Sequence, residues 1–331
     1  MDLITLAHGA GGKLTAKLID NLFKKYLGNE YLFQGDDGAV LSLPTSKIVF
    51  STDSFVVSPR IFPGGDIGKL AVYGTVNDLA VMGAKPLFLS LGLILEEGLM
   101  IPELERIIQS IAEAAKITGV KIVTGDTKVV EKGKGDQIYI NTSGIGVINA
   151  PFIPTGRAAK PGDKILVNGF LGDHGAAILA CRENITGDFI SDCAPLNDLI
   201  ELILENFPVH TMRDPSRGGL AATLNEIAKQ SRVGIELWEE SIPIRPQVKT
   251  LCGYLGLDAF ALANEGKVVV ILPSEVATEV LETMKTHPLG QNAAIIGEVK
   301  NEPQGIVYLK NAFGGERIID MPLGENLPRI C

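Results

Sequence analysis

The last residue of the sequence, Cys331 in Pro328-Arg-Ile-Cys331, is a thiol at the end of the chain. A catalytic nucleophile needs rigid surroundings, and a chain end does not provide them. Residues 321–331 contain two prolines and one glycine and show no helical or alternating apolar pattern. When extended they would span about 36–40 Å. We therefore expect a mobile tail that carries its thiol between two sites; an ordinary frayed terminus that ends in cysteine is the alternative.

Acidic clusters that recur through the first half of the chain indicate a metal site. Burying an unpaired carboxylate costs several kcal/mol, so Asp78, in a predicted helix among apolar residues, needs a partner. Mg²⁺ takes one or two protein carboxylates together with phosphate oxygens, which points to a bound nucleotide. For any single Asp, a helix cap or a turn is the alternative. The candidate ligands are Asp36, Asp37, Asp53, Asp78 and Asp126, and two of these Asp residues are predicted to follow directly after strands.

Two glycine-containing segments could contact phosphate. In His8-Gly-Ala-Gly-Gly-Lys-Leu-Thr15, Gly9, Gly11 and Gly12 would let the backbone approach a phosphate at the start of a helix. The segment is not a Walker A loop, because Leu14 follows Gly12-Lys13, and a turn before a helix explains it nearly as well. Met212-Arg-Asp-Pro-Ser-Arg-Gly-Gly-Leu220 combines Arg213 and Asp214 with a predicted helix start. These residue types suit a phosphate, although Arg213 and Asp214 could equally form a structural ion pair.

Composition narrows the class of protein. The net charge of -9 and the pI near 5.1 argue against nucleic-acid binding. No apolar run reaches the roughly 18 residues of a membrane span, and the N-terminus lacks the pattern of a signal peptide, so we expect a cytoplasmic protein with no membrane partner. The cysteine spacings indicate neither a zinc site nor a disulfide framework, and Cys181 is expected to be a buried structural thiol.

The length of 331 residues predicts two domains. The proline-rich and glycine-rich segment 149–163 interrupts the pattern, so we place an N-terminal domain at 1–150, a C-terminal domain at 151–320 and the tail at 321–331. Strands and helices mix without a strict βαβ repeat, which favours an α+β fold. Strands are predicted at 47–51, 87–95, 120–124, 138–147, 164–167, 234–237, 267–272 and 293–298, and helices at 13–27, 66–83, 102–118, from about 173, 196–205, after 219 and 275–285.

Five sequence motifs together resemble the PurM-like, AIR synthetase-related ATP-binding superfamily, which includes thiamine-monophosphate kinase and selenophosphate synthetase. They are Asp-Asp-x-Ala near 37, Thr-Asp-Ser near 53, Asn-Asp-Leu-Ala-x-Met-Gly-Ala at 77–84, Gly-Asp-Thr near 126 and Asp-Pro-Ser-Arg-Gly-Gly at 214–219. Within the superfamily, the segments at 8–12 and 62–68 and the Pro-Arg-Ile-Cys end resemble the HypE family of hydrogenase-maturation proteins.

This resemblance implies a homodimer whose N-terminal domains pair through their sheets, with ATP in clefts between the two domains of each chain. It implies that HypF delivers a carbamoyl group to Cys331, that the S-carboxamide is dehydrated to a thiocyanate with ATP, and that the cyanide passes to iron held by HypC and HypD. It also assigns Asp53, Asn77, Arg213 and Asp214 to the ATP site, beside the glycines and the Mg²⁺ ligands named above.

Our mechanistic hypothesis assigns two further residues. Loss of the carboxamide oxygen must be accompanied by removal of N–H protons, and we nominate Glu265, in Asn264-Glu-Gly266, as the base. We expect Lys128, which follows Gly-Asp-Thr, to orient the amide or to stabilise its phosphorylated form. For Glu265 the alternative is a solvated turn before a strand.

Two other functions use the same motifs. One is a small-molecule kinase or synthetase of the same superfamily that has no use for the tail. The other is a docking module gated by ATP, in which Cys331 is incidental. All three should bind MgATP, so the dependence of ATP turnover on Cys331 separates them.

Overall fold

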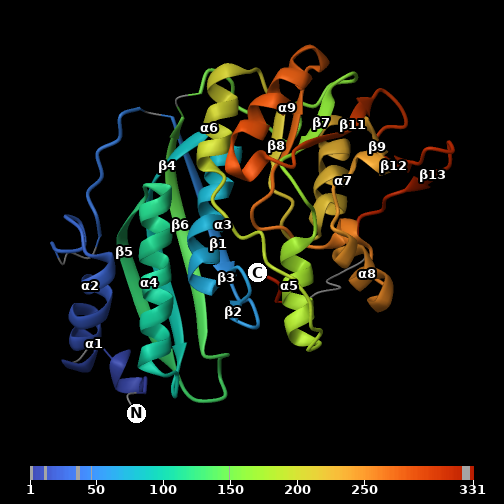
Figure 1. Ribbon diagram of the computed structural model, residues 1–331. Coiled ribbons are helices and arrows are strands. Elements are labelled where there is room, and N and C mark those ends of the chain that lie inside the picture. The colour runs from blue at the N-terminus through green and yellow to red at the C-terminus, as the bar shows by residue number, and fades with distance from the viewer. Residues whose placement is uncertain (1–2, 11–12, 35–37, 46, 149, 323–328) are drawn as a thin grey trace.

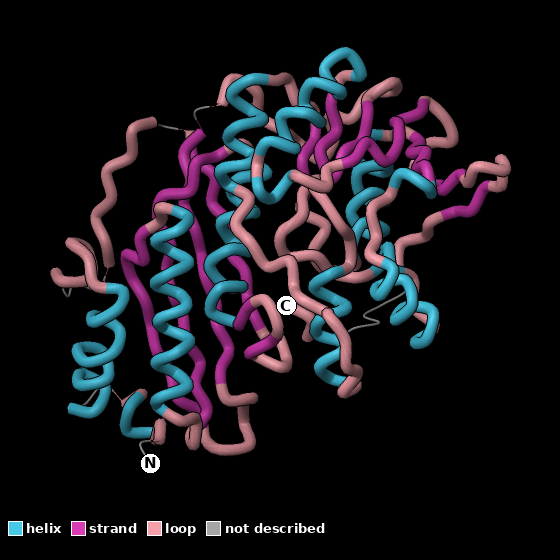
Figure 2. The backbone as a smooth tube through the Cα atoms, viewed as in Figure 1, coloured by secondary structure: helices cyan, strands magenta, loops and turns pink. Residues whose placement is uncertain are grey.

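The computed structural model describes residues 3–10, 13–34, 38–45, 47–148, 150–322 and 329–331. Within these residues the chain forms two main sheets with their helices, one from each half of the sequence (Figures 1 and 2). The strands are β1 (Ile48–Phe55), β2 (Ile61–Phe62), β3 (Gly65–Asp66), β4 (Ala84–Glu96), β5 (Lys121–Val130), β6 (Ile138–Ile148), β7 (Lys164–Val167), β8 (Thr211–Arg213), β9 (Gly234–Trp238), β10 (Val269–Leu272), β11 (Ala294–Lys300), β12 (Val307–Lys310) and β13 (Glu316–Ile318). The α-helices are α1 (Lys13–Leu18), α2 (Lys24–Leu27), α3 (Ile67–Val81), α4 (Ile101–Thr118), α5 (Asp173–Arg182), α6 (Asn197–Asn206), α7 (Gly219–Ser231), α8 (Pro246–Leu255) and α9 (Ala277–Thr286).

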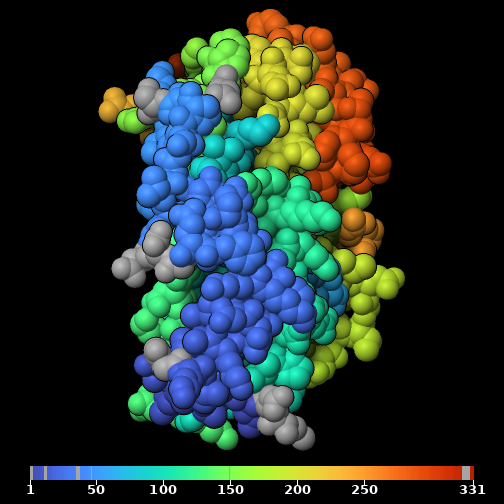
Figure 3. Space-filling view, turned by 90° about the vertical axis from the view of Figure 1, so that its left-hand side faces the viewer, coloured from blue at the N-terminus to red at the C-terminus, as the bar shows by residue number. Residues whose placement is uncertain are grey.

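The N-terminal sheet has the order β1-β6-β4-β5, in which only β4 and β5 run parallel. Helix α3 packs across it and α4 packs beside α3 (Figure 1). Because α3 is covered by the sheet, by α4 and by the second half of the chain, it is apolar on nearly all sides. In the view of Figure 3, the segment from α1 towards β1 forms much of the outer surface of this half, next to α4.

The opposite face of the N-terminal sheet has no helix over it among the described residues. Three large apolar side chains lie exposed there: Ile48 and Phe50 on β1 are 46% and 65% exposed, and Ile94 on β4 is 46% exposed. Exposed apolar residues on a wide sheet face are typical of a surface that another protein covers.

The C-terminal sheet has the order β13-β12-β9-β11-β7-β10-β8 and carries helices on both faces. On β10, Val269 and Ile271 pack in the cluster that contains α7, while Val270 and Leu272 pack with α6 and α9. Alternate side chains of a strand point to opposite faces, so both faces are apolar because both are covered. Helices α5 and α8 pack against each other, with α5 on the side that faces the N-terminal half (Figure 1).

The two halves meet where α3 contacts α6. Ala80 and Val81, at the end of α3, belong to the same buried cluster as the apolar face of α6. Lys85 Nζ lies 3.1 Å from Glu201 Oε1 across this contact. Residues 150–163, which join the halves, contain no helix or strand.

Most elements lie where the sequence predicts them, with two corrections that bear on the site. Strands β1 and β5 are longer than predicted, so Asp53 and Asp126 lie inside strands and not after them. The cause is pairing: β6 continues beside β1 as far as Phe55, so polar residues stay in the ladder. The predicted helix 13–27 is two α-helices joined by a π-helical segment, Ile19–Phe23. Strands β2, β3, β8, β12 and β13 and helix α8 were not predicted.

Candidate active site

Four acidic side chains approach one another between the two halves of the molecule. Asp53 lies on β1 and Asp78 on the facing side of α3, while Asp214 follows β8 and Glu265 precedes β10. Ser51, two residues before Asp53 on the same side of β1, donates a hydrogen bond from Oγ to Asp78 Oδ2 (2.7 Å). The strand periodicity of two therefore turns both Ser51 and Asp53 toward the helix.

Proximity and burial shift the pKa values of this cluster upward. Burial, and then the charge of Asp78 and a hydrogen bond to it, raise the pKa of Asp53 to about 7. Burial also raises the pKa of Asp78, against the hydrogen bonds from Ser51 and Asp53. The pKa of Asp214 is raised to about 7, first by burial and then by Asp78. Like charges so close together favour retained protons or a bound cation.

Glu265 is the most deeply buried of these acids, at 6% exposure. Burial first, and then the charges of Asp214, Asp192, Asp53 and Asp78, raise its pKa well above the ordinary value. Its Oε1 atom has no hydrogen-bond partner among the described residues. A buried polar atom without a partner is costly, so this oxygen faces a place where a ligand group would be stabilising.

The backbone around Glu265 is held from both domains. Asn77 on α3 donates from Nδ2 to the carbonyls of Ala194 (3.1 Å) and Glu265 (3.4 Å), and its Oδ1 accepts from Leu196 N (2.8 Å). Asp192 accepts from Glu265 N through Oδ1 (3.1 Å). The predicted nucleotide residue Asn77 thus lies at the cleft, with its amide engaged between the domains.

Asp192 and Lys267 support Glu265 and were not found from the sequence. Lys267 Nζ lies 2.9 Å from Asp192 Oδ2, and both side chains are almost fully buried. Neither residue belongs to a motif of recognisable spacing, and no sequence signal would have identified them.

Arg213 lies close enough for its charge to oppose the rise in the pKa values of Asp78 and Asp214, but its ion pair is with another residue. Its Nη1 pairs with Glu226 Oε2 on α7 at 2.8 Å, so its partner is Glu226 and not Asp214. Arg217, in the same loop, is the cation whose charge opposes the rise in the pKa of Asp53. It is exposed, so a phosphate at the cluster could reach it. Arg217 could have been predicted as a phosphate ligand from the sequence, because it belongs to the same segment, 212–220, as Arg213.

Asp126 and Lys128 are on β5, at the far edge of the sheet from β1, and form an ion pair with Nζ and Oδ1 2.7 Å apart. Across the sheet, Asp126 pairs with Gly92, Gly92 with Asn141, and Asn141 with Ser54. Paired residues point to the same face of a sheet, so Asp126 lies on the uncovered face with Ser54. Asp53 aligns instead with Thr142, whose Oγ1 donates to Ala71 O of α3. A single chain therefore does not bring Asp126 or Lys128 to the cluster of Asp53 and Asp78.

The remaining predicted residues lie in the first forty positions. Gly9 packs on β5, where a Cβ atom would stand 2.7 Å from Val129 N, so its small size serves this close approach. Gly11, Gly12, Asp36 and Asp37 lie outside the described residues.

The last three residues lie between the two halves, where Figure 1 marks the C-terminus. Val56 N donates to Cys331 O (3.0 Å), Ser58 N donates to Arg329 O (3.1 Å), and Arg329 Nε donates to Val56 O (2.9 Å). Cys331 is half-buried against the N-terminal core. Since Val56 follows the end of β1, this contact brings the backbone of the terminal cysteine next to the strand that carries Asp53. Movement of the tail stays a prediction.

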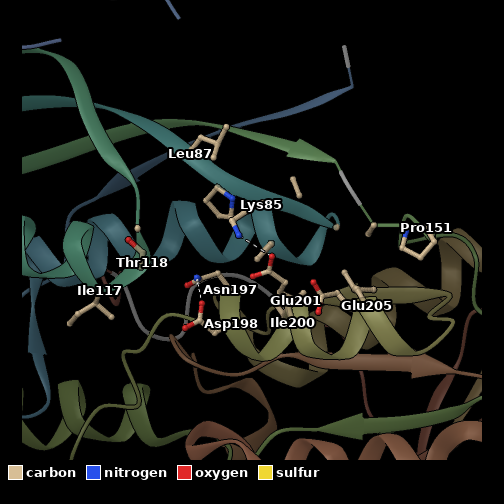
Figure 4. A pocket seen from close by; sticks show the side chains of 17 residues that line it. Lys85, Leu87, Ile117, Thr118, Pro151, Asn197, Asp198, Ile200, Glu201 and Glu205 are labelled. Carbon is tan, nitrogen blue, oxygen red and sulfur yellow. Dashed lines mark hydrogen bonds and ion pairs between the residues drawn. The ribbon is translucent and has the colours of Figure 1, made fainter. Parts of the chain in front are cut away.

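A separate pocket of about 340 Å³ lies at the contact of α3 with α6 (Figure 4). Lys85 and Glu201 face each other in it, and Asn197 Nδ2 donates to Asp198 Oδ1 (2.7 Å). None of the predicted site residues lines this pocket.

None of the helices in the described parts of the chain is long and apolar enough to cross a membrane.

Comparisons with known proteins place the two halves in one family. Residues 35–148 match the N-terminal domain, and residues 160–310 the C-terminal domain, of AIR synthase related proteins. The chain is 50% identical to carbamoyl dehydratase HypE of Cupriavidus necator, over 99% of this chain and 95% of that protein. It is 46% identical to carbamoyl dehydratase HypE of Escherichia coli over the whole of both.

Solved structures agree with these relatives. A hydrogenase maturation protein HypE in complex with ATP superimposes with a TM-score of 0.94 at 47% identity, covering 98% of this chain and 99% of that one. A HypE–HypF complex gives 0.81 at 48% identity, covering 92% and 99%. A thiamine-monophosphate kinase at 20% identity, with a TM-score of 0.60 over 90% and 98%, shares the fold.

Proposed function

The chain belongs to the HypE carbamoyl dehydratase family of AIR synthase related proteins, and on this premise we propose that it dehydrates an S-carboxamide on its own Cys331 to a thiocyanate with ATP. The observation that carries the proposal is the docked chain end: Cys331 bonds to the residue that follows β1, and β1 carries Asp53. A kinase that acts on a diffusible substrate has no need to hold its own terminal cysteine at the end of the strand that carries Asp53.

The chemistry explains why ATP is needed. An amide oxygen leaves poorly, so it first attacks the γ-phosphorus of ATP, which forms a C–O–P bond and releases ADP. Loss of phosphate then breaks the C–O bond as the nitrogen gives up its two protons in all, which leaves S–C≡N on Cys331. The net change is Cys-S-CONH₂ and ATP to Cys-S-CN, ADP and phosphate. Phosphoryl transfer of this kind depends mainly on positioning and on charge neutralisation.

The acidic cluster suits Mg²⁺, which in this proposal is bound together with the nucleotide. Carboxylate oxygens are the ligands that Mg²⁺ prefers. Asp53 and Asp78 are in contact, and both have raised pKa values, which a bound cation would lower. No three His, Cys, Asp or Glu side chains of the described residues are arranged to hold an ion by themselves. Phosphate oxygens would therefore complete the ligand set, and the ion would neutralise the negative charge of the phosphates.

Glu265 is our candidate for the base. Its raised pKa keeps it protonated while the neighbouring acids are charged and no cation is present. Neutralising those acids would lower its pKa and free it to accept an N–H proton from the carboxamide. Its unpartnered Oε1 is free to accept a hydrogen bond, and then a proton, from that nitrogen. Glu265 would thus become a base only when nucleotide and cation are present.

Lys128 and Asp126 require a second copy of the chain in this account. They lie on the uncovered sheet face, with the exposed Phe50 and Ile94. Pairing two such faces about a twofold axis parallel to the strands sets β5 of one chain opposite β1 of the other. The partner's Lys128 would then lie over the outer face of β1, near the end of the strand at which Cys331 docks. A homodimer would thereby both cover the apolar surface and bring Lys128 to the docked tail.

The tail must also reach other proteins. A relative is solved as a HypE–HypF complex, and we propose that HypF carbamoylates Cys331 here too. The thiocyanate would then give its cyanide to iron held by HypC and HypD, to supply the cyanide ligand of a [NiFe] hydrogenase. Neither protein can act on a thiol enclosed in the cleft, so Cys331 must alternate between docked and exposed positions.

The test is the dependence of ATP turnover on the terminal thiol. We would carbamoylate the purified protein and measure phosphate release with MgATP for the parent, for Cys331→Ala and for the matched control Cys252→Ala. We expect turnover to be lost only in Cys331→Ala. Equal turnover in all three would favour a kinase, and no turnover in a parent shown to bind ATP and to carry the carbamoyl group would favour a docking module.

A further inference from the structure

We propose that one face of α5 is the binding site for the chain's own last three residues, and that His174 is the positioning residue that fixes Ile330 in it. The inference rests on the proposed role of Cys331 as the carrier of the reacting group. It adds an assignment for the C-terminal domain: the surface that receives the tail.

His174 binds the backbone of the tail directly. It is fully buried, and its Nε2 atom lies 2.7 Å from the carbonyl oxygen of Ile330. A carbonyl can only accept, so Nε2 must carry the hydrogen. The ring of His174 is therefore a donor aimed at one particular peptide group, next to the terminal cysteine.

Ser191 fixes the tautomer that this contact needs. His174 Nδ1 lies 2.8 Å from Ser191 Oγ, and Ser191 Oγ in turn accepts from Cys193 N (3.1 Å). The hydroxyl hydrogen therefore points to Nδ1, which leaves the ring proton on Nε2. Burial lowers the pKa of His174, against the charge of Asp192 and the Ile330 carbonyl, so the neutral ring is maintained.

The N-terminal domain holds His174 and Ser191 in place. Phe62 packs edge-on against the ring of His174, with centroids 5.3 Å apart. Ser191 N donates to Pro63 O (2.8 Å), and a Cβ atom on Gly64 would come within 2.6 Å of Ser191 O. Gly64 also has a φ of +95°, so glycine is required there on both counts.

Arg182 extends the same site along α5. It lies eight residues after His174, just over two helical turns, and therefore on the same face. Its Nη2 donates to Arg329 O and its Nε donates to Ser58 O (2.6 Å). Helix α5 thus binds two successive carbonyls of the tail, while the segment that follows β1 binds the other edge of the same residues.

The side chains of the tail add selectivity to these backbone contacts. Ile330 is 3% exposed and belongs to the N-terminal core cluster, and Arg329 pairs with Asp136. The ligand that fits is a tripeptide with a basic residue in the left-handed conformation (φ +56° at Arg329), an apolar residue and a small terminal residue. Because its contacts come from both domains, docking of the tail also links them.

If the tail left the site, the buried Nε2–H group of His174 would have no hydrogen-bond acceptor. A buried donor without a partner is unfavourable, so the contact shifts the population toward the docked tail. Removing the donor should release the tail without disturbing the ATP cleft, because His174 does not belong to the acidic cluster.

The experiment measures the rate at which a maleimide alkylates Cys331 in the full-length protein without nucleotide, resolved by mass analysis of the C-terminal peptide. We expect His174→Leu, of similar volume, to raise the rate about tenfold, as loss of one neutral hydrogen bond allows. His174→Gln, which restores a donor near Nε2, should stay near the parental rate. Buried Cys252 in the same digest reports whether each variant remains folded.

Unchanged alkylation in a folded His174→Leu would overturn the proposal, as would an equal rise in His174→Gln and His174→Leu. If His174→Leu exposes Cys252, Arg182→Gln decides: a higher rate at Cys331 supports the site, and the parental rate overturns it. The readout needs neither ATP nor a carbamoyl group. A failure of the proposed dehydration would leave this result standing, and the reverse also holds.

Discussion

The carboxyl group of Asp53 on β1 hydrogen-bonds to the carboxylate of Asp78 on α3. Two acids in contact share a proton, or else repel each other until a cation separates them. Asp214 and Glu265 add two more acids from the other domain, both with raised pKa values. The protein without ligands therefore holds a destabilising arrangement that binding of a cation and a nucleotide would relieve.

Replacing one acid of the pair should stabilise the unliganded protein and remove its response to ligand. At pH 8 we expect Asp53→Asn to raise the melting temperature by about 2 °C or more, and to abolish the further rise that MgATP gives to the parent. Thermal unfolding with and without MgATP measures both effects. The exposed Asp198→Asn is the matched control and should behave as the parent. A lower melting temperature for unliganded Asp53→Asn would contradict this account.

The same cluster sets a pH dependence of stability. The pKa values of Asp53 and Asp214 are about 7 in the folded chain and 3.8 as the ordinary value. Between these limits the folded state binds more protons than the unfolded state, so the free energy of unfolding falls as pH rises and levels off above about pH 7. Denaturant titrations from pH 5 to pH 8 should show this fall in the parent and a smaller one in Asp53→Asn. A stability that rises across that range would disprove the assignment.

Glu265→Gln should separate chemistry from binding. Because the parental side chain is protonated in the unliganded protein, the amide replaces it at little cost in stability. We expect ATP binding and melting temperature near the parental values and a loss of dehydration of about 100-fold or more, as for removal of a general base. Single-turnover dehydration of carbamoylated protein is the measurement. Full activity in this variant would remove Glu265 from the mechanism.

The fold was largely predictable from the sequence because its strands and helices carry strong periodic patterns. Helix α4 shows its buried Ile107 and Ile111 at helical spacing, and β10 is a short apolar run. The ends of β1 were not predictable in the same way. Thr52 to Ser54 look like a polar loop, and only pairing with β6 makes them strand.

The site was predictable in its residue types but not in its assembly. Asp53, Asp78, Asp214 and Glu265 come together as expected for a cleft between domains. The local sequence could not show that Arg213 turns to Glu226, or that Asp126 faces away from Asp53, because sheet order and side-chain direction decide both. His174 had no motif around it, and its role emerges only where the tail returns to α5.

A shared active site predicts complementation between two inactive variants. Lys128→Ala and Asp53→Asn should each lose dehydration alone. Random mixing by co-refolding should restore about a quarter of the parental activity, since half the dimers then hold one intact site. A mixture of Asp53→Asn with Asp78→Asn is the control, because both changes lie in the same half of the site. No recovery in the first mixture, with dimers present, would place Lys128 outside the site.

The central claim is that Cys331 carries the group that is dehydrated. The most direct measurement is mass mapping of the C-terminal peptide after cyanate has carbamoylated the thiols, with and without MgATP. The account predicts that carbamoylated Cys331 loses one water only with MgATP, and that carbamoylated Cys181, Cys193 and Cys252 do not. Retention of that water, in protein shown to bind ATP and to carry the carbamoyl group on Cys331, would contradict it.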